Sequence, residues 1–223
     1  MKILHLSNVA GRLGGGVSEV VHSLLHYQDK LGHRSNLWFL GRKSQINEII
    51  SDNEIEKNRL TVIQSILGVR LLISPYFFLK IRRASGENNI IHQHGLFLPI
   101  SLLTLSVNKK SKIIISPHGY LEPEKLRVSS FKKKTVLRLF ENKNLKNCDC
   151  LVACSKKEAL SLRDFGLSQP VVILPNGVSE SLIRKKPPNN KDLAFKLKYD
   201  ISPNTRILLF LSRIHPFKGL ELF

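Results

Sequence analysis

The chain has 223 residues, of which 42% are hydrophobic and 23% are charged, a composition that excludes an intrinsically disordered protein, a collagen-like chain and a disulfide-rich scaffold. The 35 Lys and Arg residues exceed the 17 Asp and Glu residues, so the formal net charge is +18. A surplus of this size indicates negatively charged partners, such as a phosphorylated small molecule, an anionic membrane or a nucleic acid.

Short apolar segments rich in Ile, Leu and Val alternate along the chain with segments of helical periodicity. Near-continuous apolar runs of this kind are typical of strands that helices cover on both faces. The alternation predicts an α/β protein with a doubly wound, Rossmann-like parallel sheet, in which ligands bind beyond the carboxyl ends of the strands. The expected strands cover residues 2–9, 35–41, 90–94, 112–118, 148–154, 171–175 and 206–212.

A glycine run separates the first expected strand from the first expected helix. Gly14, Gly15 and Gly16 let the backbone approach a ligand closely, and the N-terminus of the following helix favours an anion. A flexible turn is the structural alternative. The spacing fits neither the G-x-G-x-x-G dinucleotide motif nor a phosphate-binding P-loop.

Two His–Gly pairs lie where strands are expected to end. His94-Gly95 follows one apolar run, and His118-Gly119 follows the next. A histidine on the ligand side of an α/β sheet hydrogen-bonds sugar hydroxyls or stabilises developing charge, and the alternative is a turn histidine satisfied by its neighbours. Downstream, Ser155-Lys156-Lys157-Glu158 matches a capping box and predicts the start of a helix.

Lys and Arg far outnumber Glu between Lys109 and Lys146. Apolar residues recur among the basic ones in residues 131–147, which predicts an amphipathic basic helix suited to an anionic membrane surface. The solvated face of a basic protein is the alternative. Nucleic acid is the less favoured partner, because no helix-turn-helix, zinc-finger or RNA-binding motif accompanies the charge.

Three cysteines, Cys148, Cys150 and Cys154, lie close together. Their odd number and their spacing form neither a disulfide framework nor a zinc knuckle, so buried thiols in a reducing compartment are expected. The sequence shows no signal peptide and no apolar stretch as long as a membrane span, so we expect a soluble cytoplasmic protein.

A domain boundary is expected after the turn at Pro175-Asn176-Gly177. Residues 1–178 should form the first domain, residues 179–205 an exposed linker, and residues 206–223 the truncated start of a second Rossmann-like domain, because one strand and a few helical residues bury no core. In that last segment Arg213 and Lys218 straddle a turn between an expected strand and an expected helix, where they would flank a diphosphate.

In this order the motifs resemble those of the retaining, GT-B-fold glycosyltransferases of family four, also called group 1, and the resemblance covers nearly the whole chain. The Ser-Pro-His-Gly-x-Leu-Glu-Pro form is similar to enzymes that build bacterial lipopolysaccharide, capsule or exopolysaccharide. The residues that carry the resemblance are Lys2-Ile3-Leu4-His5-Leu6-Ser7, Gly14-Gly15-Gly16-Val17-Ser18-Glu19, Leu31-Gly32-His33, Ile91-His92-Gln93-His94-Gly95, Ser116-Pro117-His118-Gly119-Tyr120-Leu121-Glu122-Pro123 and Pro175-Asn176-Gly177-Val178.

The resemblance implies hexosyl transfer from a nucleotide sugar to a saccharide or lipid-linked acceptor, with retention at the anomeric carbon and with no bound metal or cofactor. It implies that Gly15 and Gly16 approach the donor, and that His118 is catalytic and contacts the donor sugar near the reacting carbon. Arg213 and Lys218 would neutralise the diphosphate leaving group, and His94 would shape the acceptor side. The enzyme would work at the inner face of the membrane.

The sequence departs from the family pattern in one respect. The family carries a pair of donor-binding glutamates in its second domain, and this sequence ends before such a region. We therefore expect this polypeptide alone to lack transfer activity. A non-catalytic binding half of a split enzyme is the alternative, and a basic nucleic-acid-binding protein is the less favoured one.

Overall fold

The computed structural model describes residues 1–11, 14–53, 55–64, 73–108, 110–128, 130–178, 191–212, 214 and 219–222. The chain divides into a first compact unit, Met1–Asn176, and a second unit, Gly177–Phe223. The first unit contains the sheet and the histidines and glycines that the sequence analysis selects.

Strands and helices alternate along the first unit. The strands are β1 (Lys2–Ser7), β2 (Arg34–Leu40), β3 (Leu60–Ile63), β4 (Ile90–His94), β5 (Lys112–Ser116), β6 (Cys150–Ala153) and β7 (Val171–Ile173). The helices are α1 (Gly15–Lys30), α2 (Ser44–Asn53), α3 (Pro75–Glu87), α4 (Pro99–Leu105), α5 (Pro123–Arg127), α6 (Ser130–Val136), α7 (Asn142–Lys146) and α8 (Lys156–Asp164). A 3-10 turn, η2 (Lys57–Arg59), precedes β3, and a π-helical turn, η4 (Leu137–Glu141), joins α6 to α7.

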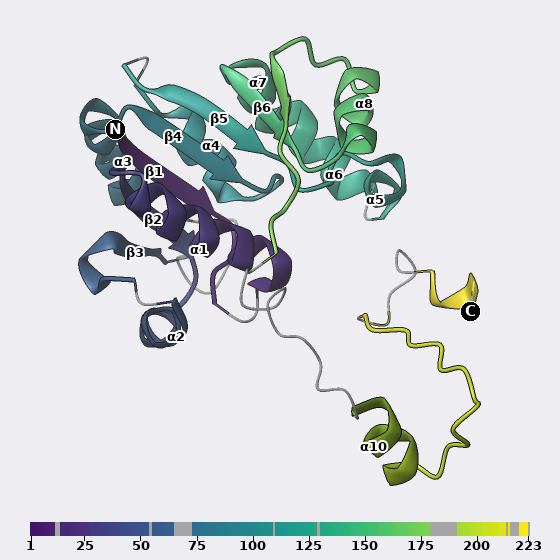
Figure 1. Cartoon of the computed structure of the whole chain (residues 1–223). Helices are drawn as coiled ribbons and strands as arrows, with labels where there is room; N and C mark the ends of the chain where they lie inside the picture. The colour runs from purple at the N-terminus through teal and green to yellow at the C-terminus, as the bar shows by residue number, and fades with distance from the viewer. Residues whose placement is uncertain are drawn as a thin grey trace. The chain divides into compact units, whose positions relative to one another are not determined.

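The strands form one seven-stranded parallel sheet in the order β3-β2-β1-β4-β5-β6-β7 (Figure 1). The chain moves outward from β1 to β3 and then returns to pair β4 with β1, so the strand order changes direction between β1 and β4. The register across this change places His5 beside His92 and Ser7 beside His94. Ligands of doubly wound sheets bind at the carboxyl ends of the strands beside such a switch point.

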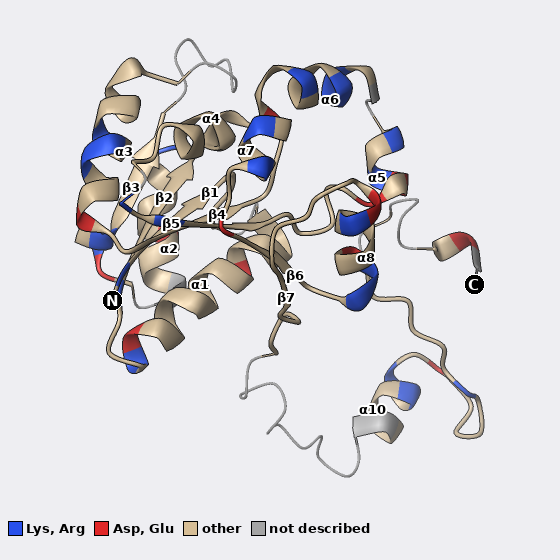
Figure 2. Cartoon of the chain, turned by 90° about the horizontal axis from the view of Figure 1, so that it is seen from above, with Lys and Arg blue, Asp and Glu red and all other residues tan. Residues whose placement is uncertain are grey.

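Helices cover both faces of the sheet, with α1 and α2 on one face and α3, α4 and α7 on the other (Figure 2). Leu4 and Leu6 belong to the apolar core that also contains Ile81 of α3 and Leu103 of α4. Side chains alternate between the two faces of a strand, so His5, which lies between these two leucines, faces α1. The opposite core, on the side of α1 and α2, contains Val21, Leu25, Leu37, Phe39 and Ile49.

The fold class predicted from the sequence is confirmed. The six expected strands of the first unit all pair in the sheet, and their ends differ from the expected ends by two residues at most. Ser155 accepts a hydrogen bond from the Glu158 backbone N–H at 3.1 Å and begins α8 as the capping box predicted. Strand β3 was not predicted, because four residues at the edge of a sheet give a weak periodic signal.

The second unit corrects one expectation and adds a helix that was not predicted. Part of the expected linker forms a helix, α10 (Lys191–Lys198). Residues 206–212, expected to be a strand, pair with no strand in the described part of the chain, and Leu208, Leu209 and Leu211 are exposed. An extended segment becomes a strand only where a neighbour takes up its backbone hydrogen bonds. The last described element is a 3-10 turn, η6 (Leu220–Leu222), and the expected domain limits stay a prediction.

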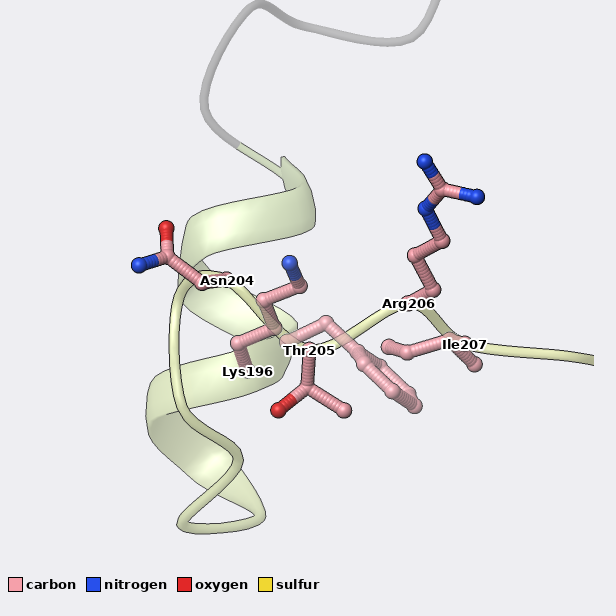
Figure 3. Close-up of a pocket in the computed structure, with 6 residues that line it drawn as sticks. Lys196, Asn204, Thr205, Arg206 and Ile207 are labelled. Carbon is pink, nitrogen blue, oxygen red and sulfur yellow. The ribbon is translucent and has the colours of Figure 1, made fainter.

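A hollow of about 580 Å³ lies within the second unit, beside α10 and the extended segment that follows it (Figure 3). The side chains around it are those of Phe195, Lys196, Asn204, Thr205, Arg206 and Ile207. All of them come from one short stretch of chain, and none was selected as a site residue. The candidate site therefore lies elsewhere, in the first unit.

Candidate functional site

The loops that follow β1, β4 and β5 contact one another at the carboxyl edge of the sheet. The side-chain amide of Asn8, after β1, donates to the Leu96 carbonyl, after β4, at 3.4 Å. His94 Nδ1, at the end of β4, lies 3.1 Å from His118 Nε2, two residues beyond β5. The structure thus brings together the two histidines that the sequence analysis selected.

The glycine loop is open to a ligand. Gly15 and Gly16 are exposed, and a Cβ atom added to either would meet no other atom within 4 Å. Gly15 has φ +52°, a conformation that favours glycine. Helix α1 begins here with no side-chain cap hydrogen bond and with no acidic residue in its first turn, so a bound anion there would meet N–H groups and the positive end of the helix dipole.

Three imidazole rings form a hydrogen-bonded chain beneath α1. Gln28 Oε1, on α1, lies 2.9 Å from His5 Nε2, and His5 Nδ1 lies 2.9 Å from His94 Nε2. The contact from His94 Nδ1 to His118 Nε2 extends the chain to the edge of the sheet. His5 and His94 are fully buried, whereas His118 is partly exposed. The row of hydrogen-bonded imidazole rings therefore connects the interior of the fold with a surface residue.

A fourth histidine, His92, packs against this chain. Its ring lies 4.1 Å from the His94 ring between centroids, and its Nε2 lies 2.8 Å from Ser116 Oγ. Nitrogens of His5, His92 and His94 lie within 4.8 Å of one another, a grouping that could hold a metal ion. Both nitrogens of His5 and of His94 already take part in hydrogen bonds, and the expectation that the protein needs no metal stays a prediction.

Burial keeps these histidines neutral. Loss of hydration lowers the pKa of His5 to about 4, despite the opposing hydrogen bond to Gln28. Loss of hydration and the neighbouring histidines hold the pKa values of His92 and His94 well below the ordinary value of 6.5. Burial also lowers the pKa of His118, against the attraction of the Glu158 carboxylate.

The His118–Gly119 turn is held in a left-handed conformation by buried Glu158. His118 has φ +55° and Gly119 has φ +74°. Glu158, near the start of α8, accepts hydrogen bonds from the backbone N–H of Gly119 at 2.5 Å and of Cys154 at 2.7 Å. Lys125 Nζ donates to the His118 carbonyl at 3.2 Å. A non-glycine residue held in this region by its surroundings is a feature of functional sites.

The loop after His94 is held by a second buried carboxylate, Glu141. Gly95 has φ +83° and Phe97 has φ +65°. Glu141 Oε2 accepts a hydrogen bond from the Phe97 N–H at 2.7 Å, and Glu141 Oε1 accepts one from Asn144 Nδ2 at 2.9 Å. Loss of hydration raises the pKa of Glu141. Glu141 is the last residue of the π-helical turn, a distortion that occurs often at functional sites.

Replacing Gly95 should destabilise the fold. The left-handed backbone costs an alanine about 1–2 kcal/mol, and its Cβ would lie 2.7 Å from Asn8 Nδ2, which holds the neighbouring loop. We expect Gly95→Ala to lower the free energy of unfolding by at least that amount, measured by urea titration. Gly86→Ala is the control, because Gly86 lies in α3 with open space around its Cβ position. Equal stability of the two variants would contradict the prediction.

Several residues of the site were not selected from the sequence. His5 and His92 lie inside apolar runs, and Gln28, Glu141 and Glu158 lie on helices. His5 and His92 carried the one available signal, a polar residue within a strand buried on both faces. Glu158 appeared in the sequence only as the last residue of the capping box, and Glu141 gave no signal, because an isolated acidic residue on a helix is ordinarily exposed.

The sequence model of Glycosyltransferase Family 4 matches residues 14–182. The chain belongs to this family. The matched range begins at the glycine loop and contains the histidine pair, both buried glutamates and six of the seven strands.

Solved structures share the fold of this family 4 chain. A glycosyltransferase from Rickettsia africae is 18% identical with a TM-score of 0.58, and the match covers 98% of this chain and 54% of that one. The S. aureus MnaA–UDP co-structure is 16% identical with a TM-score of 0.58, covering 89% and 51%. A sucrose-phosphate synthase from Thermosynechococcus elongatus is 14% identical with a TM-score of 0.54, covering 91% and 53%. These likenesses show a GT-B-type Rossmann-like fold.

This chain spans about half the length of those structures. No curated protein matches it.

Arg213 and Lys218, the expected diphosphate ligands, lie outside the described residues. Within the described part of the chain, none of the helices has the length and apolar character needed to cross a membrane.

The basic segment predicted at residues 131–147 forms α6, η4 and α7 in direct succession. Phe131 and Leu139 are 82% and 72% exposed, a strong exposure for apolar side chains. Lys and Arg residues lie along the same helices (Figure 2). Lys133 is not among the exposed basic residues of this segment, because its Nζ donates a hydrogen bond to the Lys125 carbonyl. The exposed basic residues of this segment are Lys132, Lys134, Arg138, Lys143 and Lys146.

Proposed function

We propose that this chain is the N-terminal, acceptor-side half of a retaining glycosyltransferase that transfers a hexosyl group from a nucleotide sugar to a saccharide or lipid-linked acceptor. The observation that carries the proposal is the contact between His94 and His118 at the switch point of a family 4 fold. Structural neighbours support the choice of donor, because one is a complex with UDP and another is an α-glucosyltransferase in complex with UDP-glucose and DNA. The Ser-Pro-His-Gly-x-Leu-Glu-Pro segment supports a role in bacterial cell-surface polysaccharide synthesis.

The open glycine loop suits the donor side of such a site. The Cβ positions of Gly15 and Gly16 are free of neighbouring described atoms, which leaves room for a phosphate or sugar against the backbone, and the start of α1 favours a negative charge there. In the proposed mechanism Arg213 and Lys218 neutralise the charge that grows on the departing diphosphate. His94 then shapes the acceptor side.

His118 is the residue that we propose to contact the donor sugar near the reacting carbon. Glycosyl transfer develops positive charge on the sugar ring in the transition state. A cationic imidazole beside the ring would oppose that charge, whereas a neutral one hydrogen-bonds sugar hydroxyls without doing so. Burial and the nearby Lys125 both lower the pKa of His118 and so favour the neutral form.

Transfer should be assayed with the polypeptide in the form in which its source cells contain it. We would incubate it with labelled nucleotide sugars and with lipid and saccharide acceptors, and determine the anomeric configuration of the product by NMR. Transfer with retained configuration is expected. Inversion would overturn the retaining mechanism, and no transfer from any nucleotide sugar would overturn the function.

The 223-residue chain by itself should not transfer, because it spans about half the length of the neighbouring structures. A chain that nevertheless binds saccharide acceptors would be the binding half of a split enzyme. Transfer by the isolated chain would contradict this part of the proposal.

The segment from α6 to α7 is proposed to bind the inner face of an anionic membrane. Exposed Phe131 and Leu139 would insert at the interface while the surrounding basic residues contact lipid headgroups. Cys148, Cys150 and Cys154 are free thiols in the structure, and burial raises the pKa of Cys148 to about 12, which keeps that thiol neutral.

Flotation with anionic and with neutral vesicles at low salt tests the membrane proposal. Each basic residue near the surface contributes about 1 kcal/mol, so replacing Lys132, Lys134 and Arg138 by Gln should weaken binding to anionic vesicles by about 100-fold. The control replaces Lys43, Lys57 and Lys110, which are exposed and lie outside this segment, and so removes the same charge elsewhere. Equal loss in both variants would show that net charge alone is responsible, and no binding at all would remove the proposal.

A further inference from the structure

The chain of imidazole rings couples the protonation of its members. A neutral imidazole has one N–H donor and one acceptor nitrogen, so a hydrogen bond between two neutral rings needs the N–H of one and the lone pair of the other. His5 and His94 each use both ring nitrogens, and His118 uses Nε2. Once the tautomer of one ring is fixed, the tautomers of the other two follow.

Gln28 sets the direction in which the hydrogen bonds run along the three imidazole rings. Its Oε1 accepts a hydrogen bond from Ser35 Oγ at 2.7 Å and lies 2.9 Å from His5 Nε2. An amide oxygen only accepts, so His5 carries its proton on Nε2 and leaves Nδ1 as an acceptor. His94 must then donate through Nε2 to His5 and accept through Nδ1. His118 in turn donates through Nε2, which leaves its Nδ1 unprotonated.

We propose that Gln28 and His5 are positioning residues that fix the tautomer of His118 through His94, so that His118 presents Nδ1 as a hydrogen-bond acceptor to a bound ligand. Among the described residues, the hydrogen bonds of the His118 ring involve Nε2 alone. A ligand hydroxyl or N–H is therefore the chemical group that fits. The tautomer assignment stands on the contacts alone, whereas a sugar hydroxyl as that group rests on the proposed function.

The surroundings keep the imidazole rings of His5, His94 and His118 neutral. A protonated ring would have two donors and no acceptor, and would break the sequence of hydrogen bonds. Arg59 and His92 act on His5 and His94, and Lys125 acts on His118, each disfavouring an added positive charge. Glu158, by contrast, favours protonation of His118.

Nitrogen-15 NMR of the full chain, labelled at histidine, reads the tautomers directly at neutral pH. A ring nitrogen that carries a proton and one that carries a lone pair resonate far apart, and two-bond couplings to the ring protons identify each. We expect a protonated Nε2 in His5, His94 and His118. Protonated Nδ1 in these rings would show that Gln28 donates through its amide nitrogen, and would overturn the proposal, as would averaged signals.

Two variants at Gln28 test its control of a ring two histidines away. Gln28→Glu puts a carboxylate beside His5 Nε2 and favours a protonated His5 ring, whose Nδ1 would then donate to His94 and reverse the hydrogen bonds, so His118 should carry its proton on Nδ1. Gln28→Leu removes the acceptor, and the signals of His118 should shift toward a mixture of both tautomers. Gln64→Leu, at an exposed position, is the matched control. If Gln28→Leu does not fold, a His118 ring that keeps its tautomer in Gln28→Glu while His5 becomes protonated would overturn the proposal.

Zinc offers a further discriminating measurement. If His5, His92 and His94 formed a metal site, stoichiometric Zn²⁺ would displace the shared protons and move all three sets of ring signals together. We expect no change at that ratio. None of these readouts depends on transfer activity, so the tautomer proposal and the proposed function can fail separately.

Discussion

Acidification from pH 6.5 to pH 4.5 should destabilise the chain steeply. His5, His92 and His94 are buried and neutral in the folded state, and their pKa values lie below the ordinary 6.5. In this range the unfolded chain takes up protons that the folded chain does not, so the stability that is complete above pH 6.5 is lost as the pH falls. Each such histidine contributes a slope of about 1.4 kcal/mol per pH unit, which gives about 4 kcal/mol per unit for the three.

Glu141 partly offsets this loss. Its pKa is raised by burial, so the folded chain takes up that proton before the unfolded chain does. The offset is at most that of one histidine and covers only part of the range. His118 adds a smaller loss of the same sign as the three buried histidines, because its pKa is also lowered.

Urea titrations at several pH values measure this slope. His92→Gln should reduce it by about one third, because one of three titrating groups is removed. His26→Gln is the matched control, since it removes a histidine that is exposed on α1. Equal slopes in the two variants would mean that His92 is charged in the folded state.

Replacing the His118 ring should abolish most of the proposed transfer. We choose His118→Asn because asparagine tolerates the left-handed backbone at φ +55°, so the change removes the imidazole with little added strain. Loss of a polar group that acts on the transition state lowers kcat by about 100-fold or more. The KM for the nucleotide sugar should change much less.

The matched control is His26→Asn, which places the same side chain at an exposed position of α1 and should leave kcat unchanged. Both variants are assayed in the polypeptide as its source cells contain it. A His118→Asn enzyme with kcat close to that of the control would exclude His118 from the chemistry. Unfolding curves measured alongside would separate a lost reaction from a lost fold.

The sequence was a reliable guide to the sheet because the signal is local. Near-continuous apolar runs such as residues 90–94 and 112–118 indicate strands covered on both faces, and their alternation with helical periodicity indicates a parallel sheet. The strand predicted at residues 206–212 is wrong, because the apolar run is present there but the described part of the chain supplies no neighbouring strand. Apolar composition makes a strand favourable, and only a partner makes it form.

The residues of the candidate site could be predicted from the sequence only in part. His94-Gly95 and His118-Gly119 could be selected from their places at strand ends, and the structure brings the two histidines into contact. Their partners could not be selected, because Gln28 lies 66 positions before His94 and the two are linked only through His5. The capping box identified Glu158 as part of a helix start but not as a buried carboxylate, and nothing identified Glu141, since burial of a helical glutamate depends on what packs over it.

The sequence by itself determined the fold class, the glycine loop, the histidines at the strand ends and the basic helix, because each depends on the identity and spacing of residues close together in the chain. Only the tertiary structure decided the strand order, which places β4 beside β1 and so aligns His5 with His92. It also decided which polar groups are buried and hydrogen-bonded to one another. Those contacts join residues far apart in sequence, and the free energy of burying a polar group depends on the partner that it meets.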